Sequence, residues 1–166
     1  MSLDNILQNA AEDDMANKYL TFALGKEEFG IEICYVTEIV GMQKITAVPD
    51  FPDSFEGITN LRGRIIPIMN IRKCFKKEVV EYNDRTCIII LDINNVAFGV
   101  IVDMVSEVIE IPAENIAEPP KFSASASNRY VKGVAKTGDT IKLILDCKKI
   151  LSEDQLNVLD ELASAK

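Results

Sequence analysis

The sequence predicts a mainly β protein built as two small barrels, and two observations support this expectation. Short apolar segments of strand length recur along the chain with turn residues between them, a pattern typical of small barrels and sandwiches. The same residue pattern also occurs in both halves of the chain, which indicates an internal duplication. With 166 residues, 48% of them hydrophobic, the chain can form one domain or two small, joined lobes.

The first part of the repeat keeps a constant offset of 69 residues. Residues 29–40 and 98–109 share a Phe-Gly pair, a Val and a Glu at the same spacing. A second part repeats at an offset of 76, where Gly57-Ile58 falls opposite Gly133-Val134. We therefore expect two lobes, at about residues 18–84 and 85–151. How the lobes pair, and whether they exchange strands, is left open.

Each element follows from local pattern. Alternating apolar residues bounded by turn residues predict strands, and residues 25–27 and 94–95 predict hairpin turns. Residues 35–40 fit a short helix or a bent strand equally well. A capping box formed by Ser152 and Gln155, with apolar residues on one face, predicts a C-terminal amphipathic helix over 152–166. The expected strands are 19–24, 28–33, 44–48, 64–71, 86–93, 96–102 and 140–146.

Two half-chains of this size bury little core alone, so a shared apolar interface between the lobes is expected. A groove between two such lobes is a natural place for a partner to bind. Residues 1–17, which precede the first lobe, are expected to form a polar, acidic leader.

The charge of the chain excludes several classes of partner. The net charge of −8 disfavours nucleic acid and anionic membrane surfaces, which both attract clustered Lys and Arg. No apolar run approaches the roughly 20 residues that span a bilayer, and the acidic leader lacks the features of a secretory signal. We therefore expect a cytosolic chain without direct membrane insertion.

The residues that usually carry chemistry are scarce. The chain has no histidine, which excludes a His base, a Ser-His nucleophile and a phospho-accepting His. Its four cysteines form no CxxC pair and are expected to be small buried hydrophobes, so no metal, cofactor or catalytic residue is predicted. The alternative is a small carboxylate enzyme that uses Glu38 and Glu107, which the repeat relates.

The most informative stretch runs from Gly57 to Arg72. Gly57 and Gly63 permit positive φ or a close backbone approach. Pro67 within a strand predicts an edge or a bulge, because proline cannot donate a ladder hydrogen bond. Arg62, beside a glycine in a turn, carries a five-donor fork suited to a carboxylate, either of a partner or of this chain.

This stretch, Gly-x-x-Asn-Leu-Arg-Gly-x-Ile-x-Pro-x-x-x-x-Arg, closely resembles the signature of the CheW family. The resemblance covers roughly Lys18 to Leu151 and includes the Phe-Gly segment of residues 29–39. It departs from the family pattern at Asn70, where Asp is usual. It implies two SH3-like barrel lobes with a hydrophobic join, in a non-enzymatic adaptor that couples chemoreceptor tips to the regulatory domain of the CheA histidine kinase.

The resemblance also implies sites and a location. Val36, Glu38, Gly57 and Arg62 match the surface that the family uses for the receptor tip. Thr86, Cys87 and Ile88 match a region used near the kinase. The protein would act in the cytoplasm, at receptor arrays on the inner face of the membrane. An adaptor of a parallel kinase pathway, such as twitching, is the alternative within the same family.

Overall fold

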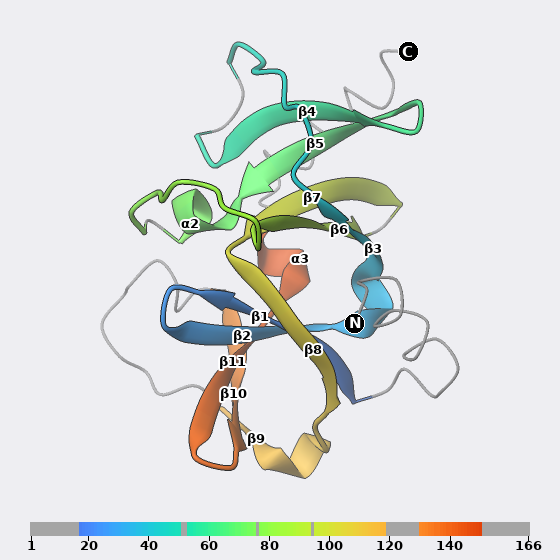
Figure 1. The fold of residues 1–166 in the computed structure, drawn as a ribbon. Coiled ribbons are helices and arrows are strands. Elements are labelled where there is room, and N and C mark those ends of the chain that lie inside the picture. Colours follow the sequence, from blue (N-terminus) through green and yellow to red (C-terminus); the bar gives the residue numbers. More distant parts are fainter. Residues whose placement is uncertain (1–16, 51–52, 76, 94, 119–129, 151–166) are drawn as a thin grey trace.

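The computed structural model describes residues 17–50, 53–75, 77–93, 95–118 and 130–150, which form two sheets. Figure 1 shows one lobe above the other, with α3 between them. The prediction of a mainly β, two-lobed protein is confirmed. The five-stranded lobe has the order β3 (Val36–Gly41), β6 (Cys87–Ile93), β7 (Val96–Val102), β5 (Arg64–Asn70) and β4 (Phe55–Leu61). The six-stranded lobe has the order β8 (Met104–Glu110), β1 (Lys18–Leu24), β2 (Glu27–Glu32), β11 (Thr140–Leu145), β10 (Val131–Thr137) and β9 (Ile116–Ala117).

Neither lobe is one contiguous half of the chain. The β1–β2 hairpin of the first half pairs with β8 and β11, and the β6–β7 hairpin of the second half pairs with β3 and β5. Each exchanged hairpin joins its new sheet through one antiparallel and one parallel contact. The halves 18–84 and 85–151 therefore trade their equivalent hairpins, so each lobe contains strands of both.

The short helices follow the same duplication. The side chain of Asn70 accepts a hydrogen bond from the backbone N–H of Arg72 before α2 (Ile71–Cys74), and Asp146 does the same for Lys148 before α3 (Cys147–Ile150). The backbone N–H groups of Asn70 and Asp146 donate to Ser54 and Tyr130, at 2.8 and 2.7 Å. An amide oxygen serves this cap as well as a carboxylate, so Asn70 fits where the family pattern has Asp.

A single short contact extends each sheet beyond its last hairpin. In the five-stranded lobe, Thr46 exchanges two backbone hydrogen bonds with Ile58. In the six-stranded lobe, Ala117 of β9 pairs with Val134 of β10. Ile58 and Val134 are equivalent at the offset of 76. The two contacts are thus copies of one feature, in which the segment after an edge strand returns along the opposite edge.

The main core lies between the lobes rather than inside either one. Side chains alternate along a strand, so Cys87, Ile89 and Leu91 of β6 face the other lobe while Ile88 and Ile90 fill their own. A small third cluster around Tyr19 and Ile144 fills the six-stranded lobe. This arrangement confirms the expected hydrophobic join and explains why β6 is apolar at nearly every position.

Several local predictions need correction. The strand predicted at 44–48 is wrong, since the structure has only the bridge at Thr46, shortly before Pro49. The set of expected strands also lacks β4, β8, β9 and β10, which the structure contains. The ambiguous residues 35–40 divide into the end of η1 (Ile33–Tyr35) and most of β3. Residues 1–16 of the predicted leader and the helix predicted at 152–166 lie outside the described residues.

Pro67 occupies the kind of position that its chemistry requires. β5 pairs with β7 only from Ile68 onward, so Pro67 has a strand partner on the β4 side alone. Opposite it, Ile58 turns both backbone groups toward Thr46. The missing N–H of Pro67 therefore costs the sheet no hydrogen bond with β4, which agrees with the predicted edge character.

Besides η1, the described residues contain one further short 3₁₀ helix, η2 (Ala113–Asn115), which precedes β9.

Candidate protein-interaction site

The turn that joins β4 and β5 presents Arg62 to solvent. Leu61 and Arg64 pair across the turn, and the two residues between them, Arg62 and Gly63, have φ values of 52° and 85°. Positive φ at both central positions is the type I′ geometry of two-residue hairpins. The side chain of Asn60 accepts a hydrogen bond from the N–H of Gly63 at 2.8 Å, which stabilises the turn.

Arg62 forms an ion pair with Glu38 of β3. Two of the four residues predicted for the receptor surface therefore lie in direct contact, although 24 residues separate them in sequence. The side chain of Arg62 is 66% exposed and that of Glu38 is 31% exposed. Arg62 thus has a carboxylate partner within the chain and still projects outward, so its guanidinium keeps donors that face solvent.

Val36 lies two residues before Glu38, where β3 begins. It follows η1 and is half-buried against the core between the lobes. A shift in the β3–β6 register falls between Val36 and Glu38. A register shift of this kind changes the direction of side chains along a strand, so Val36 joins the core while Glu38 reaches Arg62.

Gly57 has a packing role in this structure. Its φ is 147°, and a Cβ built there would overlap the backbone carbonyl of Thr46. A Cβ on its repeat partner Gly133 would likewise overlap the side chain of Ile116. Both glycines permit the close approach of the segment that returns along the sheet edge. Gly57 therefore lies against the segment at Thr46, and a substitution of Gly57 would affect a partner only through the shape of β4.

The three residues predicted near the kinase are buried. Thr86 is 8% exposed, Cys87 5% and Ile88 0%. The hydroxyl of Thr86 accepts a hydrogen bond from the N–H of Asn83, and β6 lies between β3 and β7. Their side chains therefore do not form an outward surface. A partner that senses this region would contact its neighbours, such as Gly41, which pairs with Cys87 at the edge.

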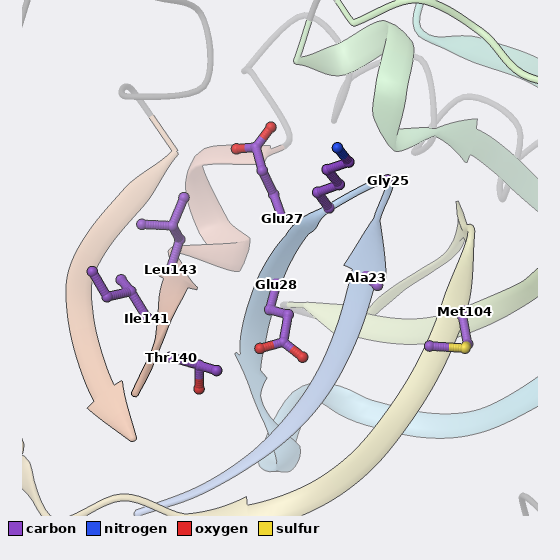
Figure 2. A pocket seen from close by; sticks show the side chains of 9 residues that line it. Ala23, Gly25, Glu27, Glu28, Met104, Thr140, Ile141 and Leu143 are labelled. Atoms are coloured by element: carbon purple, nitrogen blue, oxygen red, sulfur yellow. The ribbon is translucent and has the colours of Figure 1, made fainter. Parts of the chain in front are cut away.

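A groove of about 640 Å³ opens in the six-stranded lobe. Figure 2 shows that its lining comes from β11 on one side of the β1–β2 hairpin and from Met104 of β8 on the other. Apolar and charged side chains both contribute, as suits a protein partner. The lining residues are Ala23, Gly25, Lys26, Glu27, Glu28, Met104, Thr140, Ile141 and Leu143.

The groove contains a side chain that sequence reasoning missed. Ile141 is 60% exposed and Ile65, its repeat partner at the offset of 76, is 46% exposed. Both stand near the start of a strand whose later residues enter the core. The matching offset could have drawn attention to them, but only burial separates an exposed isoleucine from a core one.

The structure offers little for catalysis. Glu38 and Glu107 lie on strands of different lobes, and the carboxylate of Glu38 pairs with Arg62. Burial raises the pKa of the Cys87 thiol and raises that of Cys147 to about 12, which keeps both protonated. Cys34 is exposed, contrary to the expectation for all four cysteines. Among the described residues, no cluster of three metal-binding side chains occurs, and no helix there has the length and apolarity to cross a bilayer.

Known proteins resemble this chain over most of its length. A protein of Klebsiella aerogenes named Chemotaxis protein CheW is 34% identical over 155 residues, 93% of each chain. One of the same name from Treponema pallidum is 34% identical over 156 residues, 92% of each chain. A crystal structure described as scaffolding protein TtCheW, from Thermoanaerobacter tengcongensis, matches with a TM-score of 0.76 and 34% identity. The match covers 84% of this chain and 94% of the chain in that crystal structure.

The sequence model described as CheW-like domain matches residues 18–155, which include all strands of both lobes. The chain belongs to the CheW-like domain family.

Proposed function

We propose that the protein is a non-enzymatic chemotaxis scaffold that couples the cytoplasmic tips of chemoreceptors to the regulatory domain of the CheA kinase. Family membership supports the scaffold role, since its relatives are named chemotaxis and scaffolding proteins. The single observation that carries the receptor part is the exposed Arg62–Glu38 pair on a fixed turn. It would work in the cytoplasm, in arrays at the inner face of the membrane.

The receptor face would recognise a helical hairpin through charge and shape. A guanidinium has five donors in a planar fork, so Arg62 can keep its ion pair with Glu38 and still donate hydrogen bonds to a carboxylate of a receptor helix. Glu38 holds the guanidinium in one place, which lowers the entropy lost on binding. Val36 and Gly57 would contribute by setting the course of β3 and β4 beside this pair.

The kinase face is proposed to lie on a different part of the molecule. Thr86, Cys87 and Ile88 would act indirectly, because their burial fixes the position of β6 and the neighbouring edge of β3. The groove around Ile141 offers the exposed apolar surface that a domain-sized partner needs. Two separate faces allow one chain to bind both partners at once.

Receptor binding is tested by Arg62→Asp, which places a like charge beside Glu38. We expect this variant to lose co-sedimentation with receptor-containing membranes while its binding to the kinase regulatory domain survives. Arg64→Asp is the matched control, since Arg64 is an exposed arginine two residues away on β5. Equal co-sedimentation of wild type and Arg62→Asp would disprove the role of Arg62.

The adaptor class itself is tested by a pull-down with a CheA regulatory domain. We expect a complex to form at protein concentrations of roughly tens of micromolar, as for a transient signalling contact. Failure to bind a chemotaxis kinase, with binding to the kinase of a parallel pathway such as twitching, would favour the alternative adaptor. Turnover of a small substrate that is lost in Glu38→Gln would instead favour the carboxylate enzyme.

A further inference from the structure

Arg72, the last residue of the motif, lies in α2 where the two lobes meet. Its Nε donates to Oδ1 of Asp103 at 2.9 Å and its Nη2 donates to Oδ2 at 2.5 Å, a two-bond contact between guanidinium and carboxylate. Its Nη1 donates to the carbonyl of Glu78 at 2.9 Å. The side chain of Arg72 is only 13% exposed, so water competes weakly for these bonds.

Asp103 connects this arginine to the other lobe. It stands between β7 of the five-stranded lobe and β8 of the six-stranded lobe. Its Oδ2 also accepts a hydrogen bond of 2.8 Å from the N–H of Gly25, in the turn between β1 and β2. A Cβ on Gly25 would lie 3.6 Å from Nη2 of Arg72. The guanidinium therefore packs directly against the turn of the exchanged hairpin.

The same contacts form one end of the groove. Gly25 lines the groove, and so does Met104, the neighbour of Asp103. Glu27, a third lining residue, forms an ion pair with Lys77, which follows α2 in the chain. Two bridges thus hold the β1–β2 turn to the five-stranded lobe at the edge of the groove.

We infer that Arg72 is a positioning residue that acts through Asp103, fixing the β1–β2 turn and so the shape of the groove for its partner. The part that concerns a partner rests on the proposed function. The positioning of the turn is a property of the protein alone and can be measured without a partner.

The duplication supplies a matched control within the molecule. Lys148 is the repeat partner of Arg72, and the backbone N–H groups of both are capped by the side chain two residues earlier. Cys34 stands where Asp103 stands in the other half. Lys148→Ala therefore removes a long cationic side chain from the equivalent helix position and leaves the Asp103 bridge in place.

The first readout is amide hydrogen exchange at Gly25, measured by NMR in the full chain. Because Asp103 loses its anchor, Arg72→Ala should exchange the Gly25 amide about tenfold faster, the effect of a lost hydrogen bond to a charged group. Amides of Cys87–Ile93 should keep their protection. Arg72→Lys, a milder change that keeps the charge, should fall between. Lys148→Ala should leave Gly25 unchanged.

The second readout is the affinity for the CheA regulatory domain. Arg72→Lys should weaken it severalfold while co-sedimentation with receptors through Arg62 persists. Unchanged Gly25 exchange in both Arg72 variants, or the same change in Lys148→Ala, would overturn the inference. A loosened turn with undiminished kinase affinity would remove the groove as docking site. A wild-type protein that binds no kinase domain would refute the proposed function, and the exchange result would still stand.

Discussion

Single glycines in this protein differ in what surrounds them, and this determines their tolerance of a side chain. Gly57 faces the backbone of Thr46, whereas Gly63 has a positive φ but nothing within 4 Å of a built Cβ. We expect Gly57→Ala to cost about 2 kcal/mol or more, since backbone must move. Gly63→Ala should cost only about 1 kcal/mol of conformational strain. Urea unfolding of both variants measures this, and equal losses would contradict the crowding at Gly57.

The Asp103 carboxyl gives the protein a defined response to acid. Its hydrogen bonds from Arg72 hold the pKa of Asp103 below the ordinary value. A group with a lowered folded pKa contributes stability above its unfolded pKa, near 3.9, and loses it as the pH falls through the folded value. The stability advantage of wild type over Asp103→Asn should therefore shrink as the pH falls below about 4. Urea midpoints across this range test it; a constant advantage would contradict it.

The sequence indicated the exposed position of Arg62 but not the burial of Gly57 or of Thr86 to Ile88, for a physical reason. The charged side chain of Arg62, beside a glycine in a turn, has few alternatives to an exposed position. The partner expected for it was a carboxylate, whether of this chain or of another protein. The residues Thr86 to Ile88 and Gly57 carry no such signal. Their burial depends on which strands surround them, and strand neighbours are not written in local pattern.

Among the elements, the pairing of β2 with β11 contains a buried charge. Nζ of Lys142, a residue only 7% exposed, lies 2.9 Å from Oε2 of Glu28 on the neighbouring strand. At the repeat positions, the five-stranded lobe has Ile66 and Ala97 instead. The other lobe thus has apolar residues in place of this charged pair, and its β5–β7 pairing begins two residues later, at Ile68.

We predict that Glu28→Ala destabilises the protein by about 3 kcal/mol, because it leaves a buried ammonium without its partner. The double variant Glu28→Ala with Lys142→Ile, which copies the other lobe, should recover most of this loss. Thermal and urea unfolding of the single and double variants measure the difference. A double variant no more stable than the single one would show that the pair matters beyond charge compensation.

Six of the eleven described strands (β1, β2, β5, β6, β7 and β11) could be predicted from sequence, whereas β4 was among those that could not. Alternation and turn residues predicted the two exchanged hairpins within about a residue at their ends. β4 contains Gly57 and a polar stretch through Asn60, which favour a turn by composition. It forms a strand because β5 and the segment at Thr46 supply partners on both sides. Tertiary pairing overrides local preference here.

At the scale of the whole molecule, the exchange of hairpins makes the two halves interdependent. A fragment of residues 18–84 lacks β6 and β7, two of the three interior strands of the five-stranded sheet. We expect this fragment and the fragment 85–151 each to be unfolded alone, and their mixture to regain β structure. Circular dichroism of the separate and mixed fragments tests this. A separately folded fragment would contradict the exchange.

The duplication was visible in the sequence, but the exchange was not. Offsets of 69 and 76 relate equivalent strands, and they remain the same whether each hairpin stays with its own half or crosses to the other. The choice depends on the tertiary contacts that the linkers permit. The large core between the lobes, with Leu20 on one side and Ile89 on the other, stabilises the crossed arrangement.

The crossing also sets an order of events during synthesis on the ribosome. The five-stranded sheet has no middle until Val102 has emerged, and the β1–β2 hairpin, made first, has no neighbour until β8 and then β11 appear. Apolar residues such as Phe22 and Phe29 therefore wait exposed through most of translation. Such non-local pairing folds slowly and exposes a chain to aggregation, so we expect the newborn chain to be more prone to aggregation than the folded protein.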